Sequence, residues 1–105
     1  MRVIEDLYTY DINEKKAKRL LRKISHGKPA KGLYVVVYPL FNDGVLEIYS
    51  YNQLLQPYYK RRSDDIEIVG ISMSKAEADM LVLGIFQKMC AEGYTDFGNL
   101  RGFFE

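Results

Sequence analysis

The side chains most able to support catalysis are few and far apart in this chain of 105 residues. It holds one histidine, His26, and one cysteine, Cys90, so a catalytic Ser–His or Cys–His pair would have to use that histidine. His26 stands beside Gly27 at the end of a predicted helix, where capping accounts for it. Cys90 falls in an apolar helical segment, which predicts a structural thiol. One histidine and one cysteine do not make a usual zinc site within one chain, so we assign no catalytic residue and expect neither metal nor cofactor.

The stretch GISMS at residues 70–74 lies between a predicted strand and a predicted helix, which is the context of a nucleophile elbow. The motif G-x-S-x-G fails because its last position is a serine. A weaker hypothesis is an anion site, in which the free N–H groups of the helix start act with Ser72, Ser74 and Lys75. A plain helix cap explains the same residues. No pair of carboxylates is placed for acid–base work, so an enzyme is the least favoured class.

Cationic side chains gather in two segments. Residues 15–31 hold eight of the 15 cations and none of the 14 acids, which leaves seven cations against 14 acids elsewhere. The second segment is YYKRR, residues 58–62. Rings that stack on bases, next to cations that bind phosphates, are typical of nucleic-acid contacts. The candidate contacts with nucleic acid or another acidic partner are Lys15, Lys16, Arg19, Arg22, Lys23, Lys60, Arg61 and Arg62.

Other observations favour a structural role for these cations, without a nucleic-acid partner. The net charge of the chain is only +1, whereas a dedicated nucleic-acid binder is usually basic throughout. No helix-turn-helix, zinc-finger or ribonucleoprotein motif is present. Asp64, Asp65 and Glu67 follow the KRR run and can neutralise it. A solvated helix face and a connector between two strands therefore remain open alternatives for the two segments.

The first basic segment belongs to an amphipathic helix predicted over residues 11–27. Asp11 with Glu14 resembles a capping box, and Gly27 supplies a left-handed stop. At about 100° per residue, the cations lie opposite a single apolar face formed by Ala17, Leu20, Leu21 and Ile24.

Three strands follow in the prediction. Residues 33–39 and 45–50 form an antiparallel hairpin around Asn42-Asp43-Gly44. The run LYVVVYPLF does not alternate, which indicates a strand covered on both faces. Residues 50–56 read as a short capped helix stopped by Pro57, and residues 66–72 as the third strand. A crossover of this kind places the second and third strands parallel.

The last predicted helix begins at Ser74, with Glu77 as its capping partner, and ends at Gly93. Its middle, MLVLGIF, is apolar in seven successive positions, so it needs cover on more than one side. The first helix, the aromatic tail YTDFGNLRGFFE or a second copy of the chain could supply that cover. We therefore predict a surface for a homodimer or a protein partner, formed by Leu81, Gly84, Ile85, Phe103 and Phe104.

These elements predict one α+β domain over residues 1–105, built as a two-layer sandwich. A three-stranded mixed sheet, made of a hairpin and a crossover strand, packs against two main helices in the order α-β-β-α(short)-β-α.

The run VLEIYSYNQLLQPYYKRR…IEIVGIS, followed by a capped helix, resembles a family of small uncharacterised bacterial proteins with the pattern L-[DE]-I…LLQPYYK…VGI. The resemblance covers about residues 33–92 and implies no site residues, because the family carries no assigned activity. It implies that LLQPYYK is a structural connector, with Leu54, Leu55, Pro57 and Tyr58 locking the crossover.

Location and role follow as expectations. The longest apolar run is too short to span a membrane, the acids near the N-terminus do not fit a signal peptide, and a single cysteine fits a reducing compartment. We expect a cytoplasmic, non-catalytic assembly protein that self-associates, with nucleic-acid binding as the alternative.

Overall fold

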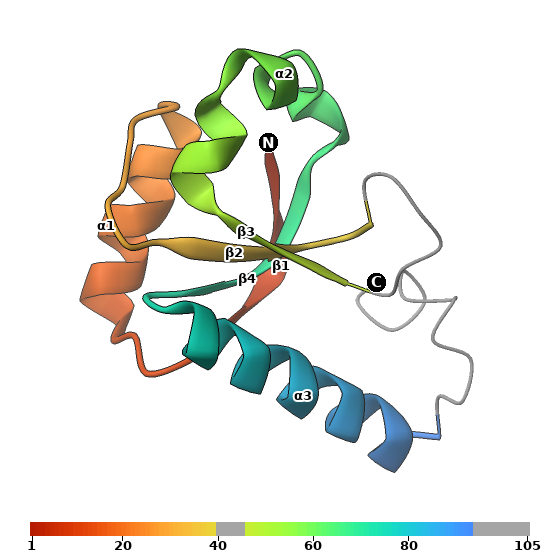
Figure 1. Cartoon of the computed structure of the whole chain (residues 1–105). Coiled ribbons are helices and arrows are strands. Elements are labelled where there is room, and N and C mark those ends of the chain that lie inside the picture. Colours follow the sequence, from red (N-terminus) through yellow and green to blue (C-terminus); the bar gives the residue numbers. More distant parts are fainter. Residues whose placement is uncertain (40–45, 94–105) are drawn as a thin grey trace.

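A four-stranded mixed sheet forms the centre of the computed structural model, which describes residues 1–39 and 46–93 (Figure 1). The strand order is β1-β4-β2-β3, and β1 pairs with β4 in parallel. Both β4 and β3 run antiparallel to β2, so they are parallel to each other on either side of it. The predicted hairpin and the parallel direction of its return strand and the crossover strand are confirmed. The turn predicted at residues 42–44 lies outside the described residues. The strands are β1 (Arg2–Thr9), β2 (Tyr34–Val37), β3 (Glu47–Ser50) and β4 (Glu67–Ser72).

Helical elements link and cover these strands. Two long helices, α1 (Glu14–Ser25) and α3 (Lys75–Ala91), follow β1 and β4. Between β3 and β4 the chain makes a compact connector of three short pieces, which are η1 (Tyr51–Leu55), α2 (Pro57–Lys60) and η2 (Ser63–Asp65). None of the helices in the described part of the chain is long and apolar enough to cross a bilayer.

The sheet has one strand more than the sequence predicted. The missed strand, β1, is an edge strand that carries the acids Glu5 and Asp6. Its pairing is irregular, because Val3 opposes Ile68 while Tyr8 opposes Gly70. Five steps along β1 therefore match two along β4, as in a bulged edge. Exposed acids and a bulge protect a sheet edge from further pairing, and they also hide the strand from a search for alternating residues.

The helices cover both faces of the sheet, so the predicted two-layer arrangement is wrong. Val35 and Val37 of β2 pack in one core with α1, whereas Val36 packs in a second core with α3. Figure 1 shows α1 and α3 on opposite sides of the sheet. The three valines are fully buried, as the unbroken apolar run of this strand predicted. The fold is α+β, with a helix layer on each side of one sheet.

The helix caps explain where α1 and α3 begin and end. Asn13, not Asp11, caps α1, and its Oδ1 accepts a hydrogen bond of 2.8 Å from the backbone N–H of Lys16. Asp11 has a positive φ of 53° and lies before the helix, so the predicted capping box is wrong. Gly27 follows α1 with a φ of 64°, which confirms the left-handed stop. The Ser74 cap of α3 is confirmed, because its Oγ accepts a hydrogen bond of 3.1 Å from Glu77 N–H.

The connector is tied to the body of the molecule by Tyr51 and Leu54, which are fully buried. The Tyr51 hydroxyl donates to the carbonyl of Lys23 at 3.5 Å, which joins η1 to α1. The predicted cap at Ser50 forms no side-chain hydrogen bond, and Pro57 is the first residue of α2 rather than only a stop.

Candidate functional site

Helix α1 presents most of its cations to solvent. We call Lys15, Lys16, Lys18, Arg19, Arg22 and Lys23 the basic face of α1. Its buried residues, Leu20 and Ile24, lie on the opposite side. Lys18 is paired with Glu14, the one acid of the helix, at 3.2 Å. In the described part of the chain the other five cations of the face make no ion pair, so their charge is available to an acidic partner.

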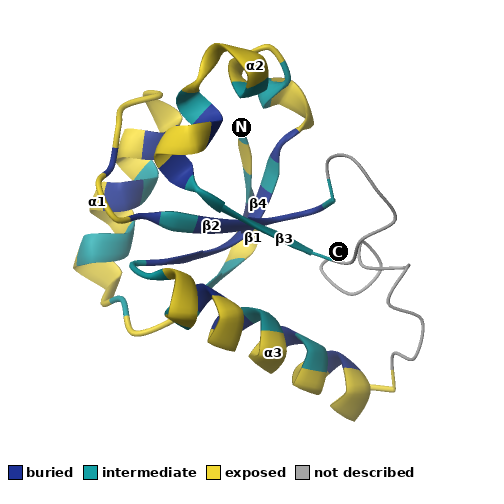
Figure 2. Ribbon diagram, in the orientation of Figure 1, coloured by how far each residue is buried: buried dark blue, intermediate teal, exposed yellow. Residues whose placement is uncertain are grey.

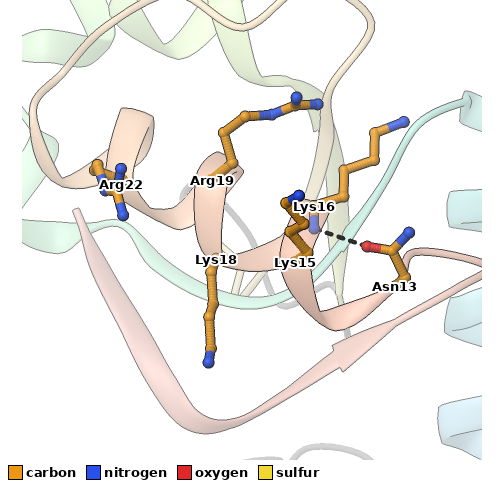
Figure 3. Close-up of a pocket in the computed structure, with 6 residues that line it drawn as sticks. All are labelled: Asn13, Lys15, Lys16, Lys18, Arg19 and Arg22. Atoms are coloured by element: carbon orange, nitrogen blue, oxygen red, sulfur yellow. Dashed lines mark hydrogen bonds between the residues drawn. The ribbon is translucent and has the colours of Figure 1, made fainter.

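An open hollow of about 590 Å³ lies among these side chains, lined by Asn13 and by all of the basic face except Lys23. Figure 3 shows Lys16 and Arg19 extending in the same direction from the helix, while Lys18 extends away from them. The hollow therefore lies between long, mobile side chains on a solvent-facing helix and is not an enclosed cavity. Such a surface suits an extended anionic partner better than a small ligand.

The second cationic segment is partly neutralised and partly built into the connector. Arg62 pairs with Asp65 at 3.8 Å, as the neighbouring acids predicted. The Tyr59 ring is half-buried and meets the rings of Tyr49 and Tyr58 edge-on, with centroids 5.6 and 5.1 Å apart. Tyr58 contacts Tyr59 within the connector but is 60% exposed, so it is held less firmly than the fully buried Tyr51 and Leu54.

The connector packs against the C-terminal end of α1. A hollow of about 310 Å³ lies there, with Ile24 and Leu54 in its wall. Its lining includes Ser25 and His26 at the end of α1, and Lys60 from α2. Lys60 therefore shares this hollow with the end of α1, whereas no cation of the basic face lines it. His26 is the C-cap residue of α1, as predicted.

Helix α3 buries one side and exposes another side that is nearly free of charge. Leu81 and Ile85, two residues of the predicted association surface, are 5% and 1% exposed. They pack on the sheet with Ala78 and Met89, so they belong to the core of their own chain. We call the opposite side, formed by Met80, Leu83, Gly84 and Gln87, the outer face of α3. Figure 2 shows exposed positions along this side of the helix.

The outer face is open at its centre. Met80 is 51% and Leu83 48% exposed, and a Cβ built on Gly84 would meet no atom within 4 Å. No backbone of the described residues therefore approaches Gly84. Cys90 is exposed and free, so the expectation of a structural thiol is wrong; it lies about 60° around the helix from Gln87 and away from the sheet. Phe103 and Phe104 lie outside the described residues.

The predicted anion site at residues 72–75 is held together by contacts within the chain. Ser72 is fully buried, and its hydroxyl donates to the carbonyl of Ser74 at 2.9 Å. The Ser74 side chain caps α3, and Lys75 pairs with Asp79 at 3.6 Å. All three side chains thus have partners, and the turn acts as an ordinary helix start. Within residues 1–39 and 46–93, no cluster of three His, Cys, Asp or Glu residues could hold a metal ion.

The clearest electrostatic perturbation in the described residues is at Tyr49 on β3. Burial, together with the negative charge of Glu47, raises the pKa of Tyr49 to about 12. Its hydroxyl lies 3.3 Å from Glu47 Oε1 and donates to it. This group stays protonated at neutral pH and supports packing rather than catalysis. Burial also raises the pKa of Tyr51, the connector anchor.

Three residues of the outer face, Met80, Leu83 and Gln87, were missed by the sequence analysis. Positions 80–86 are all apolar, so no polar residue marks which side of the helix faces the sheet. A helical projection holds part of the missing signal: Ala78, Leu81, Ile85 and Met89 lie within about 80° of one another, and Met80 lies opposite.

Comparison of the chain with protein-family models, with curated proteins and with solved structures finds no match. The resemblance to a family of small bacterial proteins therefore stays a prediction, and the basic face of α1 and the outer face of α3 are the features of the chain that bear on its function.

Proposed function

We propose that this protein is a small non-catalytic assembly protein that self-associates through the outer face of α3. The observation that carries this proposal is the exposure of Met80 and Leu83 on a helix with no charged residue between positions 80 and 87. Single exposed apolar residues are common on monomers. Here two such residues lie next to an open glycine on one helix side, a pattern that suits close contact with another helix.

A second copy of the chain is the partner we favour. An apolar helix side pairs readily with an identical side about a two-fold axis, because one patch then supplies both halves of the interface. The body of the molecule leaves room for this, because the described elements that contact α3 lie on its sheet side.

Light scattering and sedimentation velocity across a dilution series test this function. The wild type should form a dimer that dissociates on dilution, and Met80→Glu and Leu83→Glu should each shift the population to monomer. Tyr58→Glu is the matched control, since it removes another exposed apolar side chain away from α3. A wild type that stays monomeric at millimolar concentration would refute the proposal.

Nucleic-acid binding by the basic face of α1 is the second candidate function. Five cations of this face that make no ion pair in the described residues support it. Phosphates along a strand would neutralise these cations, and Tyr58 offers an exposed ring for a base.

Retention on single-stranded DNA at low salt tests the second candidate. The double variant Arg19→Glu, Arg22→Glu should abolish binding, because it reverses two charges in the middle of the basic face. Lys28→Glu with Lys31→Glu is the matched control, since both residues are exposed, lie after α1 and are not in the hollow of the basic face. No retention of the wild type at low salt would end this hypothesis.

We also propose a cytoplasmic location. The one cysteine of the sequence is exposed and free, and an exposed thiol persists best in a reducing compartment.

A further inference from the structure

We infer that two copies of the chain pair through α3 in antiparallel orientation, with Glu77 facing the partner's Lys88 and Met80 seated over the partner's Gly84. This inference rests on the proposed self-association and adds its geometry. It commits to a second copy because the charges and the shape of the outer face are complementary to themselves.

The charges lie at the two ends of the outer face, on the same flank. Glu77 and Lys88 are 11 positions apart, which places them about 20° from each other around the helix and about 16 Å apart along it. A two-fold axis perpendicular to the helices reverses the direction of the partner and keeps the flank. It therefore brings each Glu77 to the same height along the helix pair as the partner's Lys88, and two ion pairs form. Parallel pairing would instead place like charges at the same height.

Both charged groups are available for this contact. In the described residues Glu77 makes no ion pair; its backbone N–H is held by Ser74, while the side chain stays free to turn outward. Lys88 is exposed and touches the Tyr8 ring, with Nζ 5.4 Å from the ring centroid and 3.5 Å from its hydroxyl. That contact holds the ammonium at the flank of α3, where it can also meet a carboxylate from a second copy.

The shape of the outer face fits the same register. The axis that aligns Glu77 with Lys88 crosses α3 between residues 82 and 83, so Met80 comes within one residue, about 1.5 Å of rise, of the level of the partner's Gly84. Gly84 has no side chain, and a Cβ there would meet open space in the single chain. The Met80 side chain, which is 51% exposed, therefore has a hole to fill on the facing helix.

A charge exchange tests the register separately from self-association. Glu77→Lys and Lys88→Glu should each weaken the dimer about tenfold at low ionic strength, because two attractive surface pairs become repulsive. The double variant Glu77→Lys, Lys88→Glu should restore the wild-type dissociation constant. Glu14→Lys on α1, on the far side of the sheet, is the matched charge control and should leave dimerisation unchanged.

The central glycine gives a second readout. Gly84→Leu should leave the monomer as stable or more stable, because leucine favours a helix more than glycine does, yet it should weaken the dimer at least tenfold by filling the hole. If the wild type dimerises but the double charge variant stays as weak as the single variants, or Gly84→Leu tightens the dimer, the antiparallel register is wrong and self-association still stands. If the wild type is monomeric throughout, both proposals fail.

Discussion

Helices α1 and α3 cover opposite faces of the same sheet, yet they present opposite surfaces to solvent. Each buries one apolar side, with Leu20 and Ile24 in α1 and Leu81 and Ile85 among the buried residues of α3. The outward side of α1 carries six cations, whereas the outward side of α3 is apolar at its centre. The fold requires only the inward sides. The outward sides are therefore where the two helices differ in what they can bind.

This difference shows which exposed features call for an explanation. Cations on an outward face are stable in water without a partner, so the basic face of α1 permits binding but does not require it. Exposed Met80 and Leu83 gain from being covered, so the outer face of α3 favours association through the hydrophobic effect. For this reason we place self-association ahead of nucleic-acid binding.

The largest expected effect separates the inward and outward sides of α3. Ile85→Ala should lower the free energy of unfolding by about 2–5 kcal/mol, because it leaves a cavity beneath the sheet. Leu83→Ala should change it by less than about 0.5 kcal/mol. Urea denaturation at a protein concentration that keeps the chain monomeric measures both. Similar losses in the two variants would mean that the outer face is packed against its own chain.

Salt should distinguish the outward sides of the two helices. Raising NaCl from about 50 to about 200 mM should weaken DNA binding by the basic face about a hundredfold, if some five phosphates release counterions. Self-association through α3 should change by less than about fivefold, because apolar burial is not screened. Fluorescence anisotropy with labelled DNA, beside sedimentation of the free protein, gives both slopes. A dimer as salt-sensitive as the DNA complex would place cations, not the outer face of α3, in the dimer interface.

Alanine substitution at two glycines compares the side of α3 that packs on the sheet with its outer face. Gly70 of β4 lies beneath the packed side, and Gly84 lies on the outer face. A Cβ on Gly70 of β4 would lie 2.5 Å from Leu81 Cδ2 and 3.3 Å from the Tyr8 carbonyl oxygen. Gly70→Ala should therefore destabilise the fold by about 1–3 kcal/mol through overpacking. Gly84→Ala meets open space and should stabilise the monomer by up to about 1 kcal/mol through helix propensity. Thermal unfolding followed by circular dichroism compares them, and equal effects of the same sign would contradict the packing of α3.

The sequence predicted best the elements that carry a strong local signal. Capping at Ser74, the stop at Gly27 and the all-apolar run of β2 each fixed an element without knowledge of its neighbours. β1 was missed because Glu5 and Asp6 break its alternation, and its pairing with β4 joins residues some 65 positions apart. Such long-range pairing leaves no local trace in a sequence.

The candidate surfaces follow the same rule. The basic face of α1 was predicted residue by residue, because charge marks the solvent side of an amphipathic helix. An apolar association surface on α3 was predicted, but it was assigned to Leu81 and Ile85, which the sheet buries. When a helix is apolar all round, its sequence does not indicate which side faces the sheet. Only the packing against β2 and β4 decides which residues stay outside.

The smallest expected effect is a loss of stability at alkaline pH that arises on one face of the sheet, the face covered by α1. Tyr49 packs on the face covered by α1, and burial beside Glu47 raises its pKa to about 12 from an ordinary value of 10.0. Because the pKa is higher in the folded state, the protonated ring stabilises the fold fully below about pH 10, and this contribution is lost as the pH rises toward 12. Tyr49→Phe should therefore flatten the decline of the urea midpoint above pH 10, with Tyr58→Phe as the matched control at an exposed ring. An unchanged decline in Tyr49→Phe would mean that the alkaline loss arises elsewhere, with the buried Tyr51 of the same core as the next group to substitute.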